Sequence, residues 1–282
     1  MADIGKRNLL PVLRAAPPGL YLDGGNHGEI LLPNRDVPDS SYPGAGLDVF
    51  VYRDSEDRLV ATTAHPKVMV GEFAGLDVVA SDRRIGAFLD WGLPKDLLLP
   101  NREQETPVYA GDRVVVFVFL DTKSDRLVAT TRLDKNLDLA EPEYAPGQEV
   151  SLLVVARTPL GYKTIVNGSH WGLLYASELG APLEPGARMP GFIKLVRPDG
   201  KIDLRLDPSG YQRVKPLGTL IMDALDAAGG RLPFHDDSPP ELIREAFQSS
   251  KKAFKQALGA LYRQRKIRFT SGGIEKIENP GA

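Results

Sequence analysis

Hydrophobic and polar residues alternate along most of the first 211 residues with a period of two, which is the pattern of β-strands. The segments "YPGAGLDVFVYRD" (42–54) and "VYAGDRVVVFVFLD" (108–121) each place a glycine turn before a long run of β-branched and aromatic residues. Such runs predict strands with one face in a core and the other toward solvent or a neighbouring module.

The strand pattern is repeated along the chain. "DRLVATT" occurs at 57–63 and again at 125–131, and upstream of it "ILLPNRDVP" (30–38) matches "LLLPNREQE" (97–105). These offsets indicate a unit of about 60–70 residues with roughly five strands. That size is typical of the OB-fold, a five-stranded, partly open barrel that binds oligonucleotides across one face. We interpret "DRLVATT" as the closing strand of a barrel and not as a binding site.

A third, more diverged copy of the unit begins near Gly147. The segments "GQEVSLLVVART" (147–158) and "GYKTIVNGSHWGLLYASEL" (161–179) predict three strands, two of them joined by a tight turn at Asn167-Gly168. The segment "PGARMPGFIKLVRPDGKIDLRL" (185–206) then repeats the glycine turn, the strand, the Asp-Gly turn and the closing strand.

Near residue 212 the period changes from two to about 3.6. Three helices are predicted, from "LGTLIMDALDAAGG" (217–230), "SPPELIREAFQ" (238–248) and "SSKKAFKQALGALYRQR" (249–265). The segments "KIRFT" (266–270) and "IEKIE" (274–278) follow as a small hairpin. Three helices followed by a hairpin is the order of a winged helix.

The phrase "GLLYASEL" (172–179) is similar to the signature of S1-type RNA-binding domains, and "IGAFLDWGLPKDLLLP" (85–100) resembles their central strand pair. With "FKQALGALYRQRKI" (254–267) in the last module, nearly the whole chain resembles the conserved virulence factor B (YitL-like) family of bacteria. The resemblance implies a cytoplasmic RNA-binding protein that acts in post-transcriptional or broader regulation of gene expression, including virulence.

We therefore predict a mainly β protein with a C-terminal α+β domain. Three tandem S1-like OB-fold barrels of five strands precede a winged-helix domain. The predicted limits are 1–66 for a diverged first barrel, 67–135 for the second, 136–147 for an acidic linker, 148–211 for the third barrel and 212–282 for the winged helix.

The composition indicates in which cellular compartment the protein is expected. The chain has no cysteine, which excludes disulfides and thiolate metal sites and fits a reducing cytosol. The beginning "MADIGKRNLLPV" lacks the apolar run of a signal peptide, and no segment is apolar enough to span a bilayer. We therefore expect a cytoplasmic protein.

Charge is distributed unevenly. Residues 1–211 have a net charge of −6 (23 Lys/Arg against 29 Asp/Glu), and residues 212–282 have a net charge of +4 (12 against 8). Residues 249–268 hold seven cations without a nearby acid, and such a run would bind phosphate through counterion release. The alternatives are a merely solvated surface or a protein-interaction surface. The candidate contacts are Lys251, Lys252, Lys255, Arg263, Arg265, Lys266 and Arg268.

Single-stranded RNA requires aromatic rings for base stacking and cations for phosphates. The candidate RNA-binding residues are Tyr162, Lys163, Trp171, Tyr175 and Arg188 in the third barrel, and Phe88, Trp91 and Lys95 in the second. Alternatively, one or two of the third barrel's rings belong to its core, and Trp91 caps its barrel or holds an inter-module contact. The first barrel offers Tyr21, but "NHGEILLPNR" (26–35) departs from the S1 phrase, so a structural role is at least as favoured.

No catalytic constellation is visible in the sequence. The four histidines, at positions 27, 65, 170 and 235, lack ligand spacing, and neither a Walker loop nor a dinucleotide fingerprint occurs. We predict no enzymatic activity, no cofactor, no metal and no membrane association, with single-stranded RNA as the partner. Duplex nucleic acid and ribosome or polymerase components are the other candidate partners. They correspond to two alternative functions, a DNA-binding transcription regulator and a protein-interaction scaffold.

Overall fold

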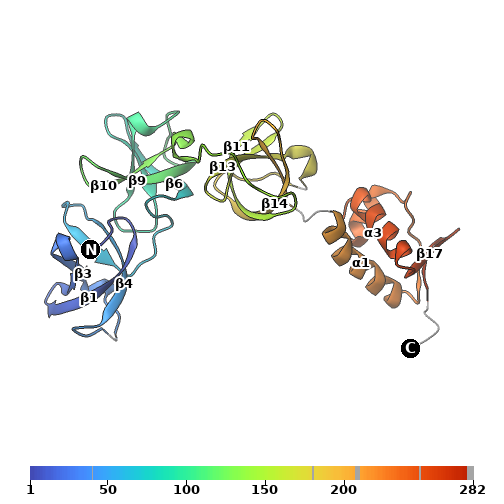
Figure 1. The fold of residues 1–282 in the computed structure, drawn as a ribbon, viewed down its shortest axis with the longest axis horizontal. Helices are drawn as coiled ribbons and strands as arrows, with labels where there is room; N and C mark the ends of the chain where they lie inside the picture. Colours follow the sequence, from blue (N-terminus) through green and yellow to red (C-terminus); the bar gives the residue numbers. More distant parts are fainter. Residues whose placement is uncertain (40, 180, 207–209, 248, 278–282) are drawn as a thin grey trace. The chain divides into compact units, whose positions relative to one another are not determined.

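The computed structural model describes residues 1–39, 41–179, 181–206, 210–247 and 249–277. Within them, three closed five-stranded barrels follow one another, and a domain of three helices and a small sheet comes last (Figure 1). The predicted fold class is confirmed. The chain forms two compact units: the first comprises Met1–Glu143, Val150–Pro190 and Arg197–Ile202, and the second comprises Tyr144–Glu149, Gly191–Val196 and Asp203–Ala282.

The three barrels share one cyclic strand order, in which the fifth strand lies between the third and the fourth. In the first two barrels the third strand pairs in parallel with the fifth, at Leu31 with Val60 and at Leu98 with Val128. The first barrel consists of β1 (Arg7–Ala16), β2 (Gly19–Asp23), β3 (Glu29–Pro33), β4 (Gly46–Arg53) and β5 (Leu59–Thr62). The second consists of β6 (Phe73–Asp82), β7 (Gly86–Asp90), β8 (Leu97–Pro100), β9 (Arg113–Asp121) and β10 (Arg126–Thr130). The third consists of β11 (Glu149–Thr158), β12 (Gly161–Val166), β13 (His170–Tyr175), β14 (Arg188–Val196) and β15 (Ile202–Arg205).

The repeated phrase "DRLVATT" forms the closing strands β5 and β10, as predicted. Its aspartates, Asp57 and Asp125, turn the chain with left-handed backbone angles, φ 62° and φ 49°. The two copies also contact each other: Arg126 Nε donates to Asp57 Oδ1 at 2.8 Å, and Arg53 Nε donates to the Asp125 carbonyl at 3.2 Å. The heptapeptide therefore joins two barrels as well as closing each of them.

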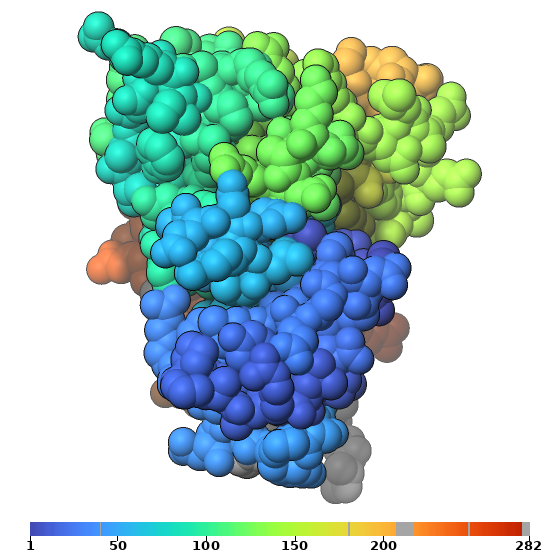
Figure 2. All heavy atoms as spheres, turned by 90° about the vertical axis from the view of Figure 1, so that its left-hand side faces the viewer, coloured from blue at the N-terminus to red at the C-terminus, as the bar shows by residue number. Residues whose placement is uncertain are grey.

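The first and second barrels share one apolar cluster, in addition to the separate core of the first barrel. Phe50 and Tyr52 on β4 meet Trp91, which follows β7, with ring centroids 5.7 and 6.2 Å apart in edge-on geometry. Lys95 completes this contact, since its Nζ donates to the carbonyls of Arg53 at 3.1 Å and Asp54 at 2.7 Å. The segment around residues 50–70, light blue in Figure 2, accordingly lies between the dark blue first barrel and the green second barrel.

The ion pair between Asp57 and Arg126 predicts an acid-dependent contact. Hydrogen bonds from Arg126 hold the pKa of Asp57 below its usual range, so its contribution to stability is present above the unfolded-state value of about 3.9 and is lost as pH falls through the lower folded value. We expect Asp57→Asn to lower the melting temperature slightly at pH 7 and to match the wild type well below pH 4, by calorimetry at both pH values.

A matched control lies in the same turn. Glu56 pairs with Arg58 at 2.8 Å, so Glu56→Gln leaves the contact between the barrels intact. An Asp57→Asn deficit of equal size at both pH values would show that the loss is not electrostatic.

The helical domain consists of α1 (Gly210–Ala227), α2 (Pro240–Phe247) and α3 (Lys251–Arg263) with a small sheet. Its core is formed by fully buried residues of all three helices, among them Ile221, Ile243, Phe254 and Leu258. The predicted hairpin is present as β17 (Ile267–Thr270) and β18 (Gly273–Lys276), and β16 (Arg231–Leu232) adds a third strand. Two residues are too few to show alternation, so sequence patterning could not reveal β16.

The predicted domain boundaries stay predictions, and parts of the ranges 148–211 and 212–282 lie outside the described residues. Among the residues that the structure describes, no helix has the length and apolarity that a membrane span requires.

Candidate nucleic-acid interface

The second strand of each barrel begins with a glycine, and this glycine makes the outward positions of the three barrels comparable. Gly19, Gly86 and Gly161 have φ of 151°, 144° and 157°, and an added Cβ would lie only 1.9–2.2 Å from a carbonyl oxygen of the neighbouring strand. Strand residues alternate between faces, so the second residue after each glycine lies on the same face as the glycine. This is the outer face of the barrel. These outward positions are Tyr21, Phe88 and Lys163, all of them half-buried.

The second barrel combines an outward ring with cations. Phe88 pairs with Ala80 and Leu98 across the two adjacent strands. Arg83 and Arg84 lie in the exposed turn from β6 to β7, just before this strand, and neither forms an ion pair with any described residue. The turn is anchored because Asn101 Nδ2 donates to the Arg83 carbonyl at 3.0 Å. Sequence reasoning missed both arginines, although "DRRIGAF" (82–88) places them directly before the aromatic motif.

The first barrel carries an equivalent but internally paired face. The Arg14 guanidinium lies 3.9 Å from the centroid of the Tyr21 ring, and it pairs with Glu29 at 2.6 Å. Hydrogen bonding to Arg14 lowers the pKa of Glu29. The aromatic position is therefore retained here, even though the following strand departs from the S1 phrase.

In the third barrel the predicted residues Lys163 and Trp171 lie together on the outer face. Lys163 Nζ lies 3.6 Å from the centroid of the Trp171 ring. The segment that follows the second barrel contacts both side chains: Trp171 Nε1 donates to Asp134 at 2.7 Å, and Lys163 lies 3.9 Å from the same carboxylate. Trp171 also packs with Leu133 and barrel-2 residues in one apolar cluster. This part of the face thus serves a contact between barrels.

Tyr175 and Tyr162 point to opposite faces of the third barrel. Tyr175 pairs with Gly161, is half-buried, and its hydroxyl oxygen accepts a hydrogen bond from the Arg197 guanidinium. Tyr162 pairs with Leu174 and is only 4% exposed. The expectation that Tyr162 faces the groove therefore conflicts with its burial, because the alternation of β12 turns it inward.

Three more predicted residues contact another barrel. Trp91 is 2% exposed and its Nε1 donates to the Lys95 carbonyl, so the alternative of an inter-module contact describes it. Lys95 is held by carbonyls of the first barrel, and burial lowers its pKa. Arg188 is largely exposed but donates to the carbonyl of Phe73 in the second barrel.

The basic stretch of the winged helix meets acids from elsewhere in the domain. Lys255 Nζ lies 3.5 Å from Asp237 and 3.7 Å from Asp236, and Arg268 pairs with Glu275 at 2.6 Å. The expectation that these cations lack a nearby acid is therefore wrong, because the fold places acids from outside residues 249–268 next to two of them. Lys251 donates to the Asp237 carbonyl at 3.2 Å. The exposed cations without an ion pair among the described residues are Lys252, Arg263, Arg265 and Lys266.

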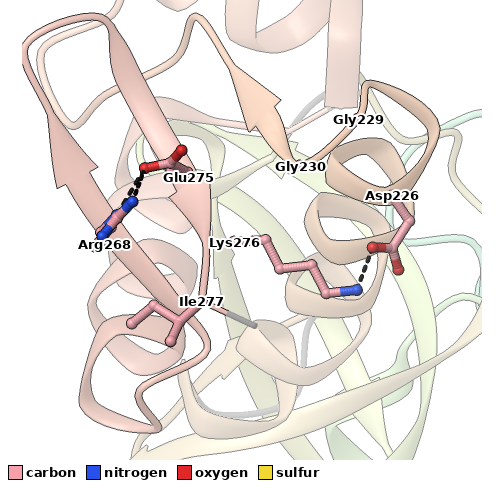
Figure 3. Close-up of a pocket in the computed structure, with 7 residues that line it drawn as sticks. All are labelled: Asp226, Gly229, Gly230, Arg268, Glu275, Lys276 and Ile277. Atoms are coloured by element: carbon pink, nitrogen blue, oxygen red, sulfur yellow. Dashed lines mark hydrogen bonds and ion pairs between the residues drawn. The ribbon is translucent and has the colours of Figure 1, made fainter. Parts of the chain in front are cut away.

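Two further polar features belong to this domain. Ligand atoms of His235, Asp236 and Asp237 lie within 4.8 Å of one another, which is close enough to hold a metal ion. The two carboxylates, however, pair with the ammonium group of Lys255. A depression of about 680 Å³ is lined by residues that include two internal ion pairs, Arg268 with Glu275 and Lys276 with Asp226 (Figure 3). Because these charges neutralise each other, the depression has no evident charge preference.

Models of two known domain families match this chain and agree with its architecture. A model of the S1 domain matches residues 4–64 and 70–132, which includes the first barrel despite its departure from the S1 phrase. A model of the CvfB-like winged helix domain matches residues 219–275.

YitL of Bacillus subtilis is 29% identical over 261 residues, covering 88% of this chain and 85% of YitL. Conserved virulence factor B of Staphylococcus epidermidis is 28% identical over 288 residues, covering 96% and 94%. A crystal structure of a multidomain protein with nucleic acid binding domains from Streptococcus pneumoniae is 22% identical, covers 97% of this chain and 98% of its own, and superposes with a TM-score of 0.44.

The fold and these matches define a class of protein, in which S1-type barrels precede a CvfB-like winged helix. Both are nucleic-acid-binding domains that are typically non-enzymatic, which supports nucleic acid as the partner. Within that class, the chain is similar over most of its length to proteins named conserved virulence factor B and YitL, as its motifs predicted.

Proposed function

We propose that this protein binds single-stranded RNA on the outer faces of its barrels, above all at Phe88, and on the basic surface of its winged helix. Its role in the cell is post-transcriptional regulation of gene expression. The observation that carries the proposal is the outward, half-buried Phe88 on β7, preceded by a turn with two exposed arginines, Arg83 and Arg84, that have no ion-pair partner among the described residues. The regulatory role is what the resemblance of the motifs implies, and the name of the relatives, conserved virulence factor B, adds only a link to virulence.

The chemistry of this face suits an unpaired strand. In OB-folds, oligonucleotides bind across the second and third strands and the loop that precedes the second strand, which are the positions of Phe88 and of the two arginines. A ring can stack only on a base that is free of a duplex, and each such stack contributes about 1–3 kcal/mol. Arginines beside the ring contact the phosphates, and Tyr21 offers a similar ring on the first barrel. Several weak sites on one chain reinforce each other through local concentration.

Substitution of Phe88 tests the proposal. We expect Phe88→Ala to weaken binding of a labelled oligouridylate by about 5-fold to 100-fold in fluorescence anisotropy at fixed salt, because one base stack is lost. Replacing Arg83 and Arg84 with alanine is expected to reduce the salt dependence of binding by about 0.7 in log–log slope for each phosphate contact removed.

Tyr109→Ala is the matched control. Tyr109 is an aromatic residue of the second barrel that is 65% exposed and lies outside β7 and β8. Removal of its ring is therefore expected to leave RNA affinity unchanged. Equal affinity of the Phe88 variant and the wild type would reject this face as the RNA site. Tighter binding of duplex DNA than of single-stranded RNA would favour a DNA-binding regulator instead.

A further inference from the structure

The winged-helix domain exposes two aromatic rings side by side. Tyr262 lies in the last turn of α3 and Phe269 lies on β17, with ring centroids 5.4 Å apart and ring planes tilted by 44°. Their residues are 55% and 43% exposed, whereas the aromatic residues Phe247 and Phe254 of the same domain are buried. Large rings contribute most when they leave water, so a solvent-facing pair is a surface available for stacking.

The surroundings of the pair are cationic. Arg263 and Arg265 follow Tyr262 in sequence, and Lys266 leads into β17. None of the three forms an ion pair with a described residue. The one acid of β17 and β18, Glu275, is engaged by both Arg268 and Arg231 at 2.6 Å. The segment that joins Tyr262 to β17 therefore carries surplus positive charge.

The backbone at Arg265 supplies an independent observation. The Arg265 N–H donates to the Tyr262 carbonyl at 2.9 Å, and the Lys266 N–H donates to the Leu261 carbonyl at 3.0 Å. These two bonds form a Schellman motif, which places Arg265 at the position after the helix cap that glycine usually fills. Arg265 adopts the left-handed conformation there, with φ 55°, which is strained for a residue with a Cβ. Strain of this kind clusters at functional sites, although it also occurs in turns such as those at Asp57 and Asp125.

We infer that Tyr262, Phe269, Arg263, Arg265 and Lys266 form an aromatic-basic platform that binds unpaired bases of single-stranded RNA. The rings stack on bases, and the three cations contact the flanking phosphates. Bases inside a duplex are covered by their neighbours, so the rings select unpaired nucleotides. The inference rests on the proposed function for the class of ligand, and it adds a site separate from the barrel faces.

The platform is tested on the full chain with Tyr262→Leu combined with Phe269→Leu, which keeps apolar bulk but removes both rings. The probes are a labelled oligouridylate and an abasic oligoribonucleotide with the same number of phosphates. We expect the variant to bind the oligouridylate at least about 5-fold more weakly and to bind the abasic probe as the wild type does. Equal losses for both probes would overturn stacking as the source of the effect.

Arg265→Gly separates binding from folding. Glycine relieves the left-handed strain, so the melting temperature is expected to stay the same or rise, while RNA affinity falls and the salt slope decreases by about 0.7. This variant decides the question if the ring variant does not fold. Unchanged oligouridylate affinity in the platform variants, with a loss in Phe88→Ala, would reject the platform and leave RNA binding by the barrel faces standing. A wild-type protein that does not bind the oligouridylate would reject both.

Discussion

Replacing Trp91 with alanine is expected to destabilise the first two barrels together, by about 3–5 kcal/mol. Trp91 is 2% exposed and meets Phe50 and Tyr52 of the first barrel edge-on, while it packs in the core of the second. Its removal leaves a cavity at the contact between the barrels and leaves the Lys95 carbonyl without its indole donor. Both losses act on the two barrels at once.

Hydrogen exchange followed by mass spectrometry locates this effect. We expect β4 of the first barrel and β7 of the second to lose protection together in Trp91→Ala, and calorimetry to show a lower melting temperature. Tyr109→Ala, at a residue that is 65% exposed, is the control and should leave both measurements unchanged. Loss of protection in β7 alone would contradict a shared apolar cluster.

The shared apolar cluster has a consequence for RNA binding by the first two barrels. Tyr21 and Phe88 occupy equivalent positions on two barrels that Trp91, Lys95 and the Asp57–Arg126 pair hold in contact. Sites at a fixed spacing gain local concentration only for strands that can span that spacing. We therefore expect Trp91 to affect RNA affinity through the arrangement of the barrels, although its own ring is buried.

The barrels could be predicted because their information is local and repeated. Alternating residues define strands, and the strand glycines at positions 19, 86 and 161 lie where a side chain would strike the neighbouring strand. The repeat also supplied the correct closing strand. The order of three helices and a hairpin was equally local, so the winged helix followed from periodicity alone.

The orientation of individual side chains could not be predicted when both faces of a strand are apolar. In β12, Tyr162 points into the barrel, whereas Ile165, on the opposite face, is buried against the second barrel. Alternation shows that the two residues lie on different faces, but not which face is inside. Lys95 and Lys255 illustrate a second limit. Their partners come from a neighbouring barrel and from a loop remote in sequence, which only the fold brings together.

Tyr162→Ala is expected to destabilise the third barrel by about 3 kcal/mol or more, because the ring fills the interior beside fully buried Thr164 and Val166. Tyr175→Ala, on the outer face of the adjacent strand, should cost about 1 kcal/mol, the range for one hydrogen bond. RNA affinity should respond in the reverse order, with Tyr175→Ala binding more weakly and folded Tyr162→Ala binding as the wild type does. Urea unfolding and anisotropy on both variants measure the two effects. A Tyr162 variant that keeps its stability but loses RNA binding would show that this ring contacts RNA and does not belong to the core.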